Sequence, residues 1–113
     1  MRVMRIGAKA HDLKLMEIPD SDHDTGDYAS LHALQEIVGG YIEPCAPAEL
    51  RARNIQLLCN EEGLLENLPL NQNLFPFFFV GDLVAVGVHN EDFVSLSEKQ
   101  VDYLIGWIER LTY

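Results

Sequence analysis

Three polar residues after an apolar run are the first candidates for binding chemistry in this chain. Asn60, Glu61 and Glu62 precede Gly63 in the sequence NEEG, which follows the largely apolar stretch 55–59. A turn held between strands fixes its polar groups at a small entropic cost, so these side chains could bind a ligand. A plain reversing turn without a ligand is the alternative interpretation. The other candidate ligand-binding residues carry hydrogen-bonding side chains: Asn71, Arg51 and Arg53.

Catalytic residue types are present, but without the spacing that catalysis requires. The sequence contains no GxSxG, HExxH or P-loop motif, and no cysteine–histidine arrangement that predicts a thiolate base. An acid–base pair of Glu61 or Glu62 with His89 is the one catalytic hypothesis left. We therefore expect a protein that is not an enzyme and that uses no cofactor.

Metal-ligand spacing is also missing. Carboxylates alternate between Asp20 and Asp27, yet the glycine at position six and the glutamate at position twelve of a calcium loop are lacking. The same charges precede a predicted helix, whose N-terminus stabilises anions. The four histidines have no zinc spacing: His11, His23, His32 and His89. We predict a solvated acidic loop and no metal site, with cation binding by the loop as the alternative.

Cys45 and Cys59 are the two cysteines of the chain. They are too few for a disulfide scaffold and lack CxxC spacing, so we expect reduced thiols in the core. A bridge between them stays open as an alternative if the strands that carry them pair.

Phenylalanines are concentrated in a short stretch of the chain. Alternation along a strand would place Phe78 on one face and Phe77 with Phe79 on the other. Helices and loops could cover both faces, but an aromatic patch left uncovered suits a dimer or partner interface. We predict a homo-oligomer. The predicted interface residues are Phe75, Phe77, Phe78 and Phe79.

Size and charge limit the classes of protein. The 113 residues predict a single domain over 1–113, and 48% hydrophobic residues are typical of a globular chain. The longest apolar run, 74–80, is too short to span a membrane, and the N-terminus lacks a secretory signal, so we expect a cytoplasmic protein. A formal net charge of -10 disfavours direct binding to nucleic acid and to anionic membranes.

The first third of the chain predicts a hairpin followed by a helix. Apolar residues alternate with polar ones in residues 1–6 and 12–18, which predicts two half-buried strands. From residue 28 to 38 the apolar residues recur at three and four positions, as in a helix. Asp27 is the expected acceptor at its N-terminus and Gly39 the left-handed residue that ends it.

The rest of the chain predicts further strands at 41–45, 55–60, 64–68 and 77–88, and a helical turn at 48–53. The NEEG turn would join 55–60 to 64–68 in a second hairpin. We expect 77–88 to be one strand with a bulge, the alternative being a two-residue turn at Gly81 and Asp82. A final helix starts after Ser97, which forms a capping box with Gln100. The fold class predicted is α+β, a mixed or antiparallel sheet of about five to six strands with two helices packed on it.

Two stretches, LQEIVGGYIE and LLCNEEGLLENLP, resemble blocks of a domain-of-unknown-function family that is widespread in phages, plasmids and their bacterial hosts. The resemblance covers nearly the whole chain and implies a compact protein of phage or mobile-element origin. It supplies no catalytic residues. The triple phenylalanine 77–79 and the acidic loop depart from the family pattern.

The resulting expectation is a non-enzymatic binding protein that acts on a process of the bacterial host, such as antiviral defence. It would sequester either a host protein or a small ligand, and a nucleotide is one such ligand. A nucleotide requires basic residues, and the candidates are Arg2, Arg5, Arg51, Arg53 and Lys99. The alternative is an acidic decoy that imitates DNA and occupies a restriction protein, which needs carboxylates at phosphate-like spacing along one face.

Overall fold

The computed structural model describes residues 1–21, 26 and 28–111, which form one six-stranded sheet and three helices. All strand pairings are antiparallel. The predicted α+β class is therefore confirmed, with a short third helix added. The elements are β1 (Arg2–Ile6), β2 (Leu13–Glu17), α1 (Ala29–Val38), β3 (Ile42–Pro44), α2 (Ala48–Arg51), β4 (Ile55–Asn60), β5 (Leu83–His89), β6 (Asp92–Val94) and α3 (Glu98–Leu111).

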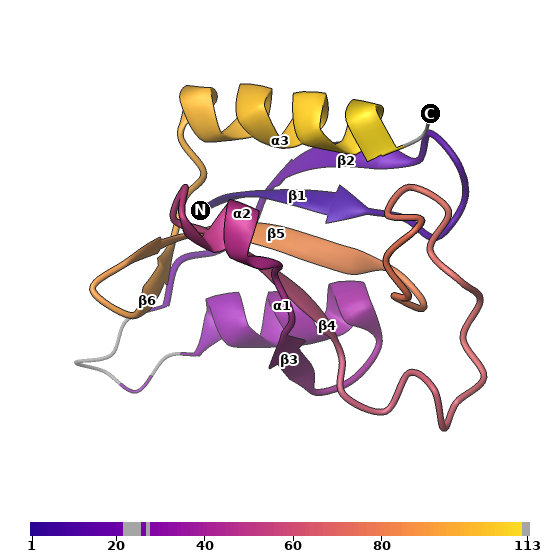
Figure 1. Cartoon of the computed structure of the whole chain (residues 1–113). Helices are drawn as coiled ribbons and strands as arrows, with labels where there is room; N and C mark the ends of the chain where they lie inside the picture. The colour runs from indigo at the N-terminus through magenta and orange to yellow at the C-terminus, as the bar shows by residue number, and fades with distance from the viewer. Residues whose placement is uncertain (22–25, 27, 112–113) are drawn as a thin grey trace.

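The sheet lies between two helices, with α3 over one face and α1 over the other (Figure 1). Successive side chains of a strand point to opposite faces, and the central strands are apolar at consecutive positions. In β4, Leu57 packs in the cluster on the α3 side, whereas Leu58 packs with α1. In β5, Ala85 and Val84 divide between the two faces in the same way. Each face of the central strands therefore has its own apolar core.

The strand order is β2-β1-β5-β4-β3, so β2 and β3 are the edges of the sheet. The strand β6 pairs with the second half of β5, beyond the part that pairs with β1. After β6 the chain reaches β1, where the Leu96 N–H donates to the Arg2 carbonyl at 2.9 Å. Along one edge of β5, the first half of the strand therefore pairs with β1 and the second half pairs with β6.

The locally encoded elements are confirmed. The β1–β2 hairpin has the register Arg2↔Glu17 to Ile6↔Leu13. Helix α1 ends at Gly39, whose φ of 81° is left-handed. Asp27, the acceptor expected at the start of this helix, lies outside the described residues. None of the described helices has the length and apolar character needed to cross a bilayer.

The start of α3 is fixed as its sequence indicates. The Gln100 N–H donates to the Ser97 hydroxyl at 3.1 Å, and the Ser97 N–H donates to the Gln100 side-chain oxygen at 2.9 Å. This reciprocal pair satisfies two N–H groups at the helix end. The Gln100 amide also donates to the carbonyls of Arg53 and Asn54, at 3.1 and 2.9 Å. The capping box therefore also ties α3 to the turn between α2 and β4.

The predicted strand at 64–68 is wrong, and with it the second hairpin. Residues 61–67 form consecutive turns. The Glu66 N–H donates to the Glu62 carbonyl at 3.0 Å, and the Leu68 N–H to the Gly63 carbonyl at 3.1 Å. These bonds satisfy backbone groups inside the segment, where a strand would need a neighbour. Asn67 also adopts a φ of 55°, which interrupts an extended chain.

The single long strand predicted at 77–88 is also wrong, because β5 begins only at Leu83. Val80 makes an isolated bridge to Leu70, and Gly81 then turns the chain with a φ of 75°. A Cβ at Gly81 would lie 2.7 Å from the Leu68 Cδ1 atom, so a larger residue would displace the end of this side chain, and the positive φ is the main reason for glycine here. The phenylalanines consequently lie in a loop before β5.

Sequence analysis missed β6 and the tight turn that leads to it. Asn90 and Glu91 connect β5 to β6, and their φ values of 49° and 69° are both left-handed. Two consecutive positive φ values are those of a type I′ turn. Asn is common in this conformation, but Glu is not, so the dipeptide does not signal a hairpin.

Candidate binding cleft

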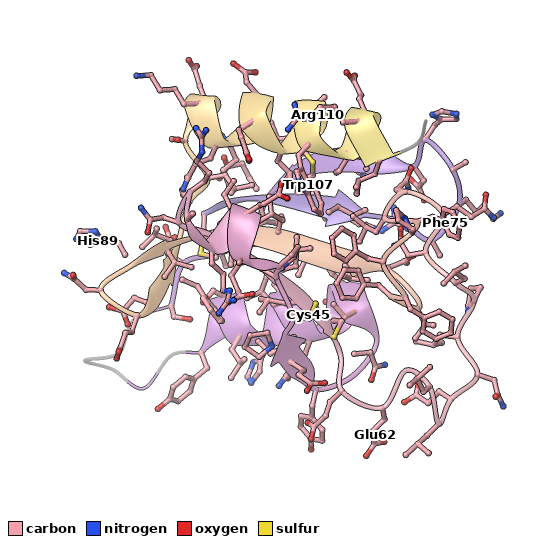
Figure 2. The ribbon with its side chains drawn as sticks, in the orientation of Figure 1. Cys45, Glu62, Phe75, His89, Trp107 and Arg110 are labelled. Carbon is pink, nitrogen blue, oxygen red and sulfur yellow. The ribbon has the colours of Figure 1, made fainter. Side chains whose placement is uncertain are left out.

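The predicted turn residues line a cleft of about 350 Å³ at one end of the sheet, here called the turn cleft. Its walls come from β3, the end of β4 with the turn that follows, and segment 78–80. Figure 2 shows Glu62 projecting from this end of the molecule. Asn60, Glu61 and Glu62 of the predicted ligand-binding residues belong to its lining. The lining residues are Glu43, Cys59, Asn60, Glu61, Glu62, Gly63, Leu64, Leu65, Phe78, Phe79 and Val80.

Asn60 builds the turn from inside. Its side-chain oxygen accepts a hydrogen bond from the Glu62 N–H at 2.8 Å. Its amide donates to the Val38 carbonyl and to the Glu66 carboxylate, both at 3.3 Å. Asn60 is buried, so its main effect is to fix the turn against the end of α1 and to leave Glu61 and Glu62 exposed.

One wall of the turn cleft is apolar and open to solvent. Leu65 is 82% exposed, Phe78 75% and Leu64 67%. Such exposure of neighbouring large apolar side chains is typical of a binding surface. The leucine pair was not among the predicted site residues. A signal was present, because two adjacent leucines cannot both face the core of a half-buried strand.

The phenylalanines divide between core and surface. The Phe77 and Phe79 rings stack with centroids 5.8 Å apart, and the Phe77 ring lies 5.6 Å from the Trp107 ring of α3. Phe78 and Phe75 point to solvent, the latter with 59% exposure. The predicted separation of Phe78 from its two neighbours therefore occurs, although in a loop. Of the predicted interface residues, Phe75 and Phe78 are exposed to solvent and therefore accessible to a partner.

The rim of the turn cleft is acidic. Glu43, Glu61 and Glu62 line it, and no described residue of its lining carries a positive charge. Carboxylates beside an apolar wall attract a ligand that is both cationic and apolar. The same carboxylates repel phosphate groups. The cleft therefore has the electrostatic character opposite to that of a nucleotide site.

Two thiols meet beside this rim. Contact with the neighbouring Cys45 thiol lowers the pKa of Cys59 from its ordinary value. The same contact raises the pKa of Cys45, as does its burial. Cys59 also lies 3.5 Å from the Glu43 carbonyl, to which its S–H can donate. Both cysteines are free thiols in this structure.

The basic candidates for nucleotide binding are dispersed and lie outside the turn cleft. Arg5 bonds the carboxylates of Asp12 at 3.0 Å and Asp82 at 3.1 Å, and the bond to Asp12 raises the pKa of Arg5. The Arg53 guanidinium stacks 4.2 Å over the Tyr103 ring. Arg2 lies on β1, Arg51 on α2 and Lys99 on α3, and none of these three residues lines the turn cleft. The structure therefore does not bring Arg51 and Arg53 to Asn60.

Arg5 also borders a second cleft, of about 510 Å³, between β2 and α1. Lys14 and Glu36 are the other charged residues of its lining. The lining of this cleft contains two basic side chains and one carboxylate. The charge of Arg5 is already paired with the carboxylates of two aspartates. Apart from Arg5, none of the predicted binding residues lies in this second cleft.

Asn71 is placed inside the protein. It has no solvent exposure, and its amide donates to the carbonyls of Ile6 and Gly81 at 3.0 and 2.9 Å. Its side-chain oxygen accepts from the Asn73 N–H at 3.0 Å. Asn73 in turn bonds the loop between β1 and β2. Both asparagines thus tie segment 70–81 to that loop and offer no surface to a ligand.

The remaining chemical candidates are not brought together. His89 lies on the opposite side of the molecule from Glu62 (Figure 2), where its ring contacts Asn90 at 3.2 Å. Within the described part of the chain, no three His, Cys, Asp or Glu residues form a group able to hold a metal. Much of the acidic loop, together with His23, lies outside that part. Its solvated or cation-bound state therefore stays a prediction.

Comparison with known proteins finds a family whose sequence model matches the chain. The sequence model of a family described as a domain of unknown function, DUF3846, matches residues 1–109. The match spans nearly the whole chain, as the resemblance predicts. No curated protein matches the chain. No solved structure matches it either.

Proposed function

We propose that the chain, which belongs to the DUF3846 family of unknown function, is a non-enzymatic binding protein that holds a host protein at the turn cleft. The partner would present a segment that is basic and apolar. The phage or mobile-element origin and the action on host defence, which the family resemblance implies, are part of this proposal. A bacterial cytoplasmic location belongs to it as well.

The exposed apolar wall of the turn cleft is the observation that supports this function. Leu65 and Phe78 are more than two-thirds exposed, and a partner that buried such side chains would gain roughly 1.5 to 3 kcal/mol from each. The acidic rim would select a cationic partner and reject phosphate-bearing ones. A host protein therefore fits this surface better than a nucleotide does.

Capture from host lysate tests the proposal with matched variants. The immobilised protein should retain a host protein, and Leu65→Ser with Phe78→Ser should abolish that retention. Leu15→Ser is the control, because Leu15 is 49% exposed on β2 and lies outside the turn cleft. Retention by the double variant equal to that of the unmodified protein would refute the proposed site.

The acidic decoy is the second candidate, favoured by the net charge of -10. Four carboxylates gather around the turn: those of Glu43, Glu61, Glu62 and Glu66. Binding by such a decoy would be lost in high salt, because the attraction between exposed charges is screened. It would also survive the double substitution at Leu65 and Phe78. Salt and the variant together therefore distinguish the two functions.

A further inference from the structure

Cys45 and Cys59 lie on neighbouring antiparallel strands. The register pairs Glu43 with Cys59 and Pro44 with Leu58. The pairing continues past the end of β3, because the Cys45 N–H donates to the Leu57 carbonyl at 2.8 Å. Cys45 and Cys59 are therefore diagonal neighbours whose side chains lie on the same face of the sheet. The two side chains are close enough for each to shift the pKa of the other, and Figure 2 shows where Cys45 lies in the molecule.

The two thiols differ in access. Cys59 lines the turn cleft, whereas Cys45 is not part of that lining. A reagent that enters the cleft therefore meets Cys59 first, with Cys45 beside it. This is the arrangement of an attacking thiol and a resolving thiol.

We propose that Cys45 and Cys59 are a reversible dithiol–disulfide site that exchanges with low-molecular-weight disulfides through the turn cleft. The Cys59 thiolate attacks one sulfur of the small disulfide, whose S–S bond breaks and releases one small thiol. Cys45 then loses its proton and attacks the Cys59 sulfur, which releases the second small thiol. The protein loses two electrons and two protons, and the small disulfide gains them.

The chemistry of the site agrees with this division of roles. The neighbouring Cys45 thiol lowers the pKa of Cys59, which increases its thiolate fraction near neutral pH. Glu43 and burial both oppose this effect. Cys59 is the largest of the groups that raise the pKa of Cys45, and its effect ends once Cys59 is in the mixed disulfide. Burial of Cys45 and the charge of Glu43 continue to raise that pKa.

The acidic rim predicts which small disulfides react fastest. Glu43, Glu61 and Glu62 surround the entrance to Cys59. Cystamine is a dication and oxidised glutathione carries net negative charge, so the rim attracts the first and repels the second. This preference should shrink in high salt and in the Glu61→Gln, Glu62→Gln variant.

Mass spectrometry of the folded full chain after treatment with cystamine tests the proposal. The unmodified protein should lose the mass of two hydrogens through a transient adduct, and dithiothreitol should reverse the change. Cys45→Ser should stop at the adduct, because it lacks the resolving thiol. Cys59→Ser should form an adduct at least about tenfold more slowly. Raising the salt should slow the reaction of Cys45→Ser with cystamine at least about threefold.

Three results would overturn the proposal: a stable adduct on the unmodified protein, absence of reaction in the folded state, or equal rates for the two single variants. Circular dichroism of each variant excludes misfolding as the cause. An effect of the disulfide on partner binding would rest on the proposed function. The exchange itself does not, so the cystamine reaction can succeed where host capture fails.

Discussion

Asn71 and Asn73 stabilise the protein by joining segments that are far apart in the chain. Asn71 bonds the carbonyls of Ile6 and Gly81, and Asn73 bonds those of Gly7 and Lys9. Buried amides satisfied in this way are costly to remove, because their partners then lose hydrogen bonds without access to water. The position of the Phe75–Phe79 stretch therefore depends on these two side chains.

Replacing Asn71 by Ala should lower the free energy of unfolding by about 2 to 4 kcal/mol, since three buried partners are left unsatisfied. Gln72→Ala is the matched control, because the Gln72 side chain is exposed and should contribute less than about 0.5 kcal/mol. Urea denaturation measures both. Equal effects of the two substitutions would contradict the structural role of Asn71.

The Cys59 thiol should titrate below an ordinary cysteine. Because the neighbouring Cys45 thiol lowers its pKa, its thiolate forms at lower pH, and alkylation by iodoacetamide should reach half its maximal rate below about pH 8.5. Cys45→Ala removes that thiol and should move this midpoint upward. Glu43→Gln removes a charge that raises the pKa and should move it downward. Peptide mapping identifies the alkylated cysteine, and a midpoint unchanged by either substitution would refute this account.

At the scale of elements, the turn between β5 and β6 carries backbone strain. Glu91 has a φ of 69°, which costs a residue with a Cβ about 1 kcal/mol relative to glycine. Glu91→Gly should therefore raise the free energy of unfolding by about 0.5 to 1 kcal/mol, as urea denaturation would measure. Glu91→Ala keeps the Cβ and should give no such gain. A loss of stability in the glycine variant would show that the Glu91 side chain matters more than its backbone.

The elements that sequence analysis predicts well are those whose determinants are local. The capping box of Ser97 and Gln100 and the left-handed Gly39 lie within a few residues of the helix ends that they fix. The segment 61–81 is different, because its course depends on bonds from Asn71 and Asn73 to residues 6–11. A strand pattern in its apolar residues cannot reveal contacts that span more than 60 positions.

The candidate site divides in the same way. The NEEG turn is predicted by its own residues, and its polar side chains line the turn cleft. Cys59 directly precedes this turn, whereas Phe78 reaches the cleft because long-range bonds such as those of Asn71 hold its loop there. The predicted arginines are absent from its lining for the converse reason: Arg5 and Arg53 are held by partners elsewhere. The types of the NEEG residues therefore predict a candidate binding site, but long-range packing determines which other residues line it.

For the whole molecule, charge and exposed apolar surface act against each other. Each copy carries a net charge of -10, which repels a second copy, while Leu65, Phe75 and Phe78 favour burial against one. The predicted homo-oligomer forms only if the apolar attraction between two copies exceeds their charge repulsion. Salt weakens the charge repulsion strongly and changes the apolar attraction little, so a salt series distinguishes the two contributions.

Self-association should therefore strengthen as salt is raised, contrary to the binding of a basic partner by an acidic decoy. Sedimentation velocity at increasing protein concentration should give a larger mean sedimentation coefficient in 0.5 M than in about 0.05 M sodium chloride, because the Debye length falls several-fold. Phe75→Ser with Phe78→Ser should weaken the association at least about tenfold, since each copy loses two large apolar contacts. Leu15→Ser, on the edge strand β2, should leave it unchanged. Monomers at every salt concentration would refute the predicted homo-oligomer.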